Sequence, residues 1–224
     1  MNILRFADFL NTAFEGYDYF ILSKLHDLAV ITKGGITPLF NFISLLAEKG
    51  IFLFLIAVIL MAFKKTRKIG VCVFGAVCCG ALITNICLKD LIVRARPFMV
   101  FTSDYNSWWQ FVGSTFEDDF SFPSGHATAA MAFATAIFLT TDKKKSWPIF
   151  LFVIVMGIAR NYLMVHYPSD ILGGILVGAV AGFISLLITE LIFKILNKHD
   201  NKFTRFVLNF DLFADSKIDK TEEL

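Results

Sequence analysis

The chain has 224 residues, of which 56% are hydrophobic and only 18% are charged, and its mean hydropathy is +0.66. These values exclude an ordinary soluble domain, because an average globular sequence carries about 25% charged residues. The formal net charge of +2 is too small for nucleic-acid binding to be the main role, so we expect a membrane protein with no nucleic-acid partner.

The N-terminal stretch, residues 1–35, predicts a segment that lies along the membrane interface. Its first 20 residues carry polar side chains every few positions and lack a compact apolar core followed by small residues, so we expect no removable signal peptide. Residues 17–48 have apolar side chains at helical spacing, interrupted by charges and by Gly34-Gly35. Interfacial helices are the first interpretation of this region, and a sixth membrane span is the second.

Five later segments are apolar and long enough to cross a bilayer, for which a helix needs about 20 residues. We predict an all-α fold: a polytopic membrane helix bundle of five to six transmembrane helices over residues 36–196, followed by a tail over 197–224 on the cytoplasmic surface. The expected spans lie near 50–63 with some upstream residues, 69–88, 124–141, 147–165 and 169–195. Four cysteines in the second span lack the spacing of a zinc or redox site, which is typical of packing residues: Cys72, Cys78, Cys79 and Cys87.

Basic residues cluster beside these spans at positions that all fall on one side of the membrane, which the positive-inside rule makes cytoplasmic. The clusters lie at 64–68, 143–145 and 194–205. The loop 89–123 and the turn 163–168 then face outward together. Ionisable residues near several span ends therefore converge on the extracytoplasmic face.

The second span ends in LKDLIVRARPF, where Lys89 and Arg96 are two helical turns apart. If the helix continues, the two cations share one face, and Pro97 marks its expected end. The alternative is that they are snorkelling residues that anchor a helix end. Arg94 fits this anchoring role better, since it points elsewhere.

The third span opens with Pro123, Ser124, Gly125 and His126. Proline suits a first helical turn, serine caps a helix, and glycine lets another group approach the backbone. Such an N-terminus offers free N–H donors and the positive end of the helix dipole, so it predicts an anion site. The alternative is an ordinary helix cap with His126 as a polar interface residue.

The fourth span ends in GIARNYLMVHYPSDILGG, where Arg160 is costly to bury unless it faces a partner or a cavity. His166 precedes Tyr167-Pro168, so we expect it on a turn. Asp170 follows in the first turn of the fifth span, within reach of one nitrogen of His166, which leaves the other nitrogen free as a base or nucleophile. A metal site is the competing use of His126, His166 and Asp170. The three cations at the same face would repel a divalent ion, so we predict a bound phosphate and no metal.

These motifs resemble those of the type 2 phosphatidic acid phosphatases, membrane lipid phosphatases related in active site to vanadium haloperoxidases and bacterial class A acid phosphatases. The family's motifs are Lys-x6-Arg-Pro, Pro-Ser-Gly-His and Ser-Arg-x5-His-x3-Asp, and here they read KDLIVRARP, PSGH and ARNYLMVHYPSD. The resemblance covers about residues 36–195, and the three motifs together, in order and with their spacing kept, are specific. Ala159 stands where the family usually has Ser, which implies a tuned affinity rather than a lost activity.

The resemblance implies a cradle for the phosphate oxygens and two catalytic histidines, without a metal or cofactor. The cradle residues would be Lys89, Arg96, Arg160, Ser124 and the backbone N–H of Gly125. His166, oriented by Asp170, would attack phosphorus to form a phosphohistidine, and His126 would protonate the leaving oxygen.

We therefore expect a lipid phosphatase of the cell membrane whose substrate is a lipid phosphate or diphosphate at the outer face. Small stand-alone members with this layout resemble undecaprenyl diphosphate phosphatases, and phosphatidic acid or phosphatidylglycerophosphate is the alternative substrate. The loop 101–120, with Trp108, Trp109 and the acidic residues 117–119, is expected to shape headgroup access, whereas His26 and His199 lie off the site. A transporter would show mid-membrane charges and an internal repeat, and neither is present. A non-catalytic lipid-phosphate-binding protein would be favoured by loss of a histidine, yet both are present.

Overall fold

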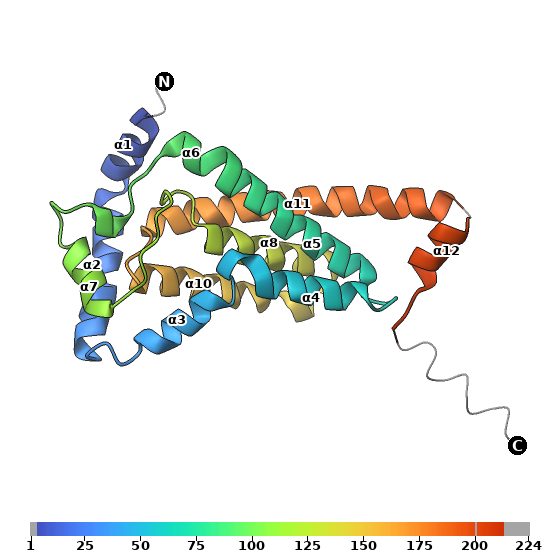
Figure 1. Cartoon of the computed structure of the whole chain (residues 1–224), viewed down its shortest axis with the longest axis horizontal. Coiled ribbons are helices and arrows are strands. Elements are labelled where there is room, and N and C mark those ends of the chain that lie inside the picture. The colour runs from blue at the N-terminus through green and yellow to red at the C-terminus, as the bar shows by residue number, and fades with distance from the viewer. Residues whose placement is uncertain (1–3, 200, 213–224) are drawn as a thin grey trace, which may run out of the picture.

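The computed structural model describes residues 4–199 and 201–212, and all regular elements in this part of the chain are helical (Figure 1). Three helical stretches are long and apolar enough to cross a membrane, namely Thr37–Met61, Arg67–Met99 and Pro168–Lys198, and Gly125–Thr140 is a shorter apolar helix. The predicted all-α membrane bundle is confirmed, and the number of spans stays a prediction. Of the predicted tail, residues 213–224 lie outside the described part.

The bundle consists of α3 (Thr37–Leu45), α4 (Ile51–Met61), α5 (Arg67–Ala81), α8 (Gly125–Thr140), α10 (Ile149–Tyr162) and α11 (Pro168–Lys198), as Figure 1 shows. Small residues let α8 and α11 pack closely, as is usual for helices in a membrane. A Cβ atom at Gly178 would lie 2.5 Å from the carbonyl oxygen of Thr128, so only glycine fits there. This packing places the N-termini of both helices side by side, and Ser124 N donates to Asp170 O across 3.1 Å.

The second long stretch does not continue as a helix to Pro97, which corrects the expectation that Lys89 and Arg96 share one helical face. After α5 the chain forms a π-helical segment, Leu82–Leu88, and the short α6, Lys89–Ile92. Val93 then adopts a left-handed conformation with φ 56°, and Arg96 is extended because Pro97 disfavours the helical region for the residue before it. A π-helical segment inside a helix often marks a functional site.

The N-terminal helices α1 (Leu4–Ala13) and α2 (Glu15–Ile31) and the loop helix α7 (Tyr105–Val112) lie across one end of the bundle, and α12 (Lys202–Asn209) lies at the other (Figure 1). Trp108 of α7 is almost fully buried and stacks on His26 of α2, with ring centroids 4.9 Å apart. The two residues therefore pack the helical cap of the bundle. Two 3-10 turns, η1 (Glu48–Gly50) and η3 (Pro97–Met99), and α9 (Lys143–Ser146) complete the described elements, and all four cysteines are free.

Candidate active site

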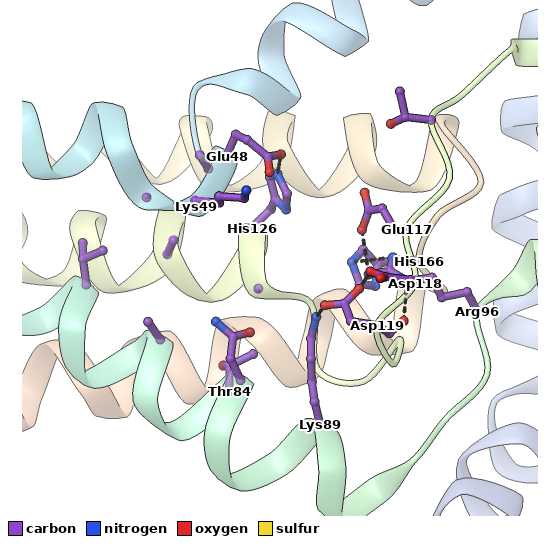
Figure 2. A pocket seen from close by; sticks show the side chains of 18 of the residues that line it. Glu48, Lys49, Thr84, Lys89, Arg96, Glu117, Asp118, Asp119, His126 and His166 are labelled. Carbon is purple, nitrogen blue, oxygen red and sulfur yellow. Dashed lines mark hydrogen bonds and ion pairs between the residues drawn. The ribbon is translucent and has the colours of Figure 1, made fainter.

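A cavity of about 620 Å³ opens at the end of the bundle that α2 covers, where the three sequence motifs converge (Figure 2). Part of its wall is apolar or consists of glycine: Ala47, Gly50, Val77, Ala81, Phe116, Gly125 and Ala129. The rest is polar or charged: Glu48, Lys49, Thr84, Asn85, Lys89, Arg96, Thr115, Glu117, Asp118, Asp119, His126 and His166. A molecule with a charged head and an apolar neck fits such a lining.

Three cations, Lys89, Arg96 and Arg160, come from separate elements and are all buried here, with exposures of 6%, 1% and 3%. Burying a charge costs several kcal/mol unless it is paired. Arg160 donates to Ser44 Oγ at 2.6 Å and to Glu117. Its Nε is buried with no hydrogen-bond partner among the described residues.

The acidic loop segment 117–119 supplies the carboxylates that neutralise this cradle. Glu117 bridges Arg160 and Arg96, with 2.6 Å between its Oε2 and Arg96 NH2, and Asp119 bridges Arg96 and Lys89. Burial alone would raise the pKa of Glu117 and Asp119, but the neighbouring cations outweigh it and lower both pKa values. These carboxylates thus occupy positions suited to a phosphate, whereas the sequence predicted only a role in headgroup access.

His166 lies on the turn between α10 and α11, as predicted, and is 1% exposed. Its Nδ1 is 3.5 Å from Asp170 Oδ2, and its Nε2 is 3.4 Å from Arg96 NH1 at the cavity. Asp170 therefore faces one ring nitrogen while the other faces the cradle. Burial and the charges of Arg96 and Arg160 lower the pKa of His166 well below its ordinary value.

Arg94 is buried at 1% exposure and holds Asp170 in place, which overturns the interpretation of Arg94 as a membrane anchor. Its NH1 donates to Asp170 Oδ1 at 2.6 Å, while Ser121 Oγ and Tyr167 N donate to Asp170 Oδ2 at 2.5 and 2.8 Å. The guanidinium also lies over the Tyr167 ring, 4.0 Å from its centroid. The left-handed turn at Val93 and the extended chain that follows redirect Arg94 into the protein interior.

The other carboxylate that pairs with Arg94 is Asp18 of α2, a residue that sequence analysis missed. Asp18 is 2% exposed, lies 3.0 Å from Arg94 NH2, and accepts from the N–H and hydroxyl of Ser169 at 2.8 and 2.6 Å. An acidic residue in a helix expected at the membrane interface gives no signal of such burial. The N-terminal helix α2 is thereby tied to the first turn of α11 and to Asp170.

His126 opens α8 and lies across the cavity from His166, with Nε2 3.1 Å from Glu48 Oε2 (Figure 2). Gly125 lines the cavity beside it. Ser124 is the N-cap of α8, is fully buried, and accepts from Ala127 N at 3.4 Å. The structure thus gathers both predicted histidines, Lys89 and Arg96 around one space, and Arg160 reaches its wall through Glu117. A phosphate contact of Ser124 stays a prediction. Residues 4–199 and 201–212 contain no group of three or more His, Cys, Asp or Glu side chains that could hold a metal ion.

This chain is similar in sequence to a known protein family and to several characterised proteins. The PAP2 superfamily model matches residues 66–194. Undecaprenyl-diphosphatase BcrC of Bacillus subtilis is 30% identical over 128 residues, which are 57% of this chain and 62% of that protein. Phosphatidylglycerophosphatase B of the same organism is 34% identical over 104 residues, 42% of this chain and 45% of that protein. The chain therefore spans less than two thirds of the length of either relative.

The fold is also that of a solved membrane protein. The crystal structure of a transmembrane PAP2 type phosphatidylglycerolphosphate phosphatase from Bacillus subtilis superposes with a TM-score of 0.61 at 22% identity, covering 85% of this chain and 95% of that one. At this identity the likeness concerns the fold alone, and together with the apolar helices it makes this chain a multi-pass membrane protein.

Proposed function

The chain belongs to the PAP2 superfamily, and from this membership and the geometry of the cavity we propose that it is a metal-independent lipid phosphatase acting through a phosphohistidine. The observation that carries the proposal is the position of His166 between Asp170 and a group of buried cations. Its Nδ1 faces Asp170, its Nε2 lies 3.4 Å from Arg96 NH1 at the cavity that Lys89 also lines, and Glu117 joins Arg96 to Arg160. Fixed cations can neutralise the charge that develops on a transferring phosphoryl group, which is the main catalytic requirement of such a reaction.

In the first step, the lone pair of His166 Nε2 attacks phosphorus and the bond from phosphorus to the leaving oxygen breaks. Asp170 holds the proton on Nδ1, which keeps the ring in the reactive tautomer and stabilises the positive charge that develops. His126 donates a proton to the leaving oxygen. In the second step, water attacks the phosphohistidine, gives its proton to His126 and releases phosphate.

The substrate's phosphate must displace Glu117 and Asp119 to reach the cradle, because both carboxylates already pair with its cations. A phosphate dianion replaces these two charges with oxygens that suit bidentate guanidinium donors. The apolar wall of Val77, Ala81 and Ala129 then lies beside the lipid part of the substrate.

Undecaprenyl diphosphate is the first proposed substrate, supported by the relative named undecaprenyl-diphosphatase BcrC. Phosphatidylglycerophosphate is the second, supported by the relative named phosphatidylglycerophosphatase B, and phosphatidic acid is the third. The active site is proposed to face the extracytoplasmic side. The connection between α4 and α5, a segment rich in basic residues, lies at the end of the bundle near α12 and opposite α2 (Figure 1), and basic residues favour the cytoplasmic side.

Phosphate release by the purified protein in detergent, with excess chelator, tests the proposed function. We expect release from undecaprenyl diphosphate, phosphatidylglycerophosphate or phosphatidic acid, and the ranking of kcat/KM identifies the substrate class. Release from none of the three lipids, or release that the chelator abolishes, would contradict the proposal.

The pH profile of kcat/KM provides a second test, because only neutral His166 can attack phosphorus. Its lowered pKa keeps the ring neutral as pH falls, and activity is lost only when pH drops through that lowered value. We therefore expect the acidic limb of the profile to lie below about pH 6.5, the ordinary pKa of histidine. An acidic limb at or above this pH, measured with one substrate in detergent, would contradict the assignment of the nucleophile.

We expect the protein to bind anions more tightly when the negative charges of the acidic loop segment are removed. The double variant Glu117→Gln, Asp119→Asn is expected to bind orthovanadate or inorganic phosphate about 10-fold more tightly, since each 1.4 kcal/mol of lost competition is tenfold in affinity. The measurement is the inhibition constant of each anion. Asp118→Asn is the control, because Asp118 lines the cavity but makes no ion pair with another described residue. Equal or weaker inhibition of the double variant would show that the carboxylates do not compete with anions.

A further inference from the structure

Glu48 touches one of the two catalytic histidines, although it belongs to none of the three motifs and lies outside residues 66–194, the part of the chain that the family model matches. Its Oε2 is 3.1 Å from His126 Nε2, and both side chains line the same cavity (Figure 2). The His126 side chain is 12% exposed and that of Glu48 is 44% exposed, so the contact lies where the cavity opens to solvent.

The η1 turn presents Glu48 to the cavity through an unusual backbone. Lys49 and Gly50 are both left-handed, with φ of 49° and 70°, which breaks the apolar stretch between α3 and α4 at this point. Gly50 is buried against α5, and a Cβ atom there would lie 3.0 Å from Val77 Cγ1. At Gly50 the left-handed backbone and the close contact with Val77 both favour glycine, so the turn packs tightly against α5.

We propose that Glu48 is the positioning residue of the general acid His126, an inference that rests on the function proposed above. The contact commits Nε2–H of the ring to Glu48 and leaves Nδ1 to give its proton to the leaving oxygen. The carboxylate also stabilises the imidazolium form, which is the form that can donate. This arrangement parallels the contact between Asp170 and His166, so each histidine has its own carboxylate partner.

Charged residues other than Glu48 also influence the protonation of His126. Burial and Arg160 of α10 oppose the protonated ring, whereas Glu117 of the loop favours it, and Lys49 and His166 line the same cavity. Because the substrate's phosphate displaces Glu117 from the cradle, Glu48 is the carboxylate that stays beside His126 during the reaction.

The test compares two leaving groups in the full-length protein. With a lipid phosphate monoester the leaving alkoxide needs a proton, so Glu48→Gln is expected to lower kcat at least about 10-fold, part of the 10²- to 10⁴-fold that general acid catalysis contributes, with KM little changed. The alkaline limb of the kcat profile should move to lower pH, because the imidazolium loses its anionic partner. With p-nitrophenyl phosphate the leaving group needs no proton at neutral pH, so the rate of the first step, measured as the burst of p-nitrophenolate, should change less than about threefold.

Matched variants separate this inference from the proposed function. His166→Ala should lose activity on both substrates, and retained activity there would contradict the proposed function itself. If His166→Ala is inactive but Glu48→Gln slows both substrates equally, or slows neither, the role of Glu48 is wrong. Glu48→Asp, which keeps the charge, should restore the alkaline limb, and Glu190→Gln, at an exposed ion pair with Lys68, should leave both rates unchanged. Glu48→Gln should add nothing in a His126→Ala background, because the two residues act as one unit.

Discussion

Replacing His166 by alanine is expected to lower kcat on every lipid substrate by on the order of 10⁴-fold or more, because the proposed covalent intermediate forms on this side chain. The nitrogen that faces the cradle is lost, while the cations that bind phosphate remain. KM should therefore change far less than kcat. The measurement is phosphate release in detergent under saturating substrate.

A trapping experiment identifies the intermediate directly. Rapid quenching of the active protein with a radiolabelled lipid phosphate should leave an acid-labile, alkali-stable label on the chain, as is typical of phosphohistidine, and His166→Ala should carry none. His199→Ala is the matched control, since His199 is exposed and lies just after the end of α11. A label that persists in His166→Ala would assign the nucleophile to another residue.

Replacing Arg94 by leucine is expected to destabilise the fold by about 3–5 kcal/mol, the range for removing one partner of a buried ion pair. Arg94, Asp18 and Asp170 have exposures of 1%, 2% and 0%, so both carboxylates would be left buried without their cation. Asp170 would also lose a 2.6 Å hydrogen bond, and kcat should fall because His166 is less firmly oriented. The measurements are the free energy of unfolding in detergent and kcat on a lipid phosphate.

Two further variants isolate the effect of burial. Arg94→Lys keeps the charge but cannot reproduce the planar fork that joins Asp18 to Asp170, so it should recover only part of the stability. Lys68→Met removes the cation of the exposed pair with Glu190, where about 0–1 kcal/mol is expected. An Arg94→Leu protein as stable and active as the unaltered chain would mean that the buried network does not support the nucleophile.

Much of the candidate site could be predicted from short stretches of sequence, because its chemistry depends on residues with fixed local spacing. The Ser124 cap begins α8 as expected, and the proline after Tyr167 keeps His166 on a turn with Asp170 one helical turn away. Apolar length and composition were sufficient for the all-α membrane class, since a bilayer accepts few other structures. The conditional expectation that the helix continues to Pro97 was wrong, because a left-handed residue, Val93, ends it early and no proline or glycine marks that position.

What only the tertiary structure decided is the set of partners that complete the site. Asp18, Glu48 and Glu117 come from three elements that the sequence did not connect to the histidines, and each contacts a residue at least 43 positions away. A carboxylate in α2 or in a loop is typical of a solvated surface until packing buries it against a cation. Local sequence thus determined which groups could perform chemistry on a phosphate. The fold decided which charges neutralise and orient them, because the energy of a buried charge depends on neighbours brought together by packing rather than by sequence order.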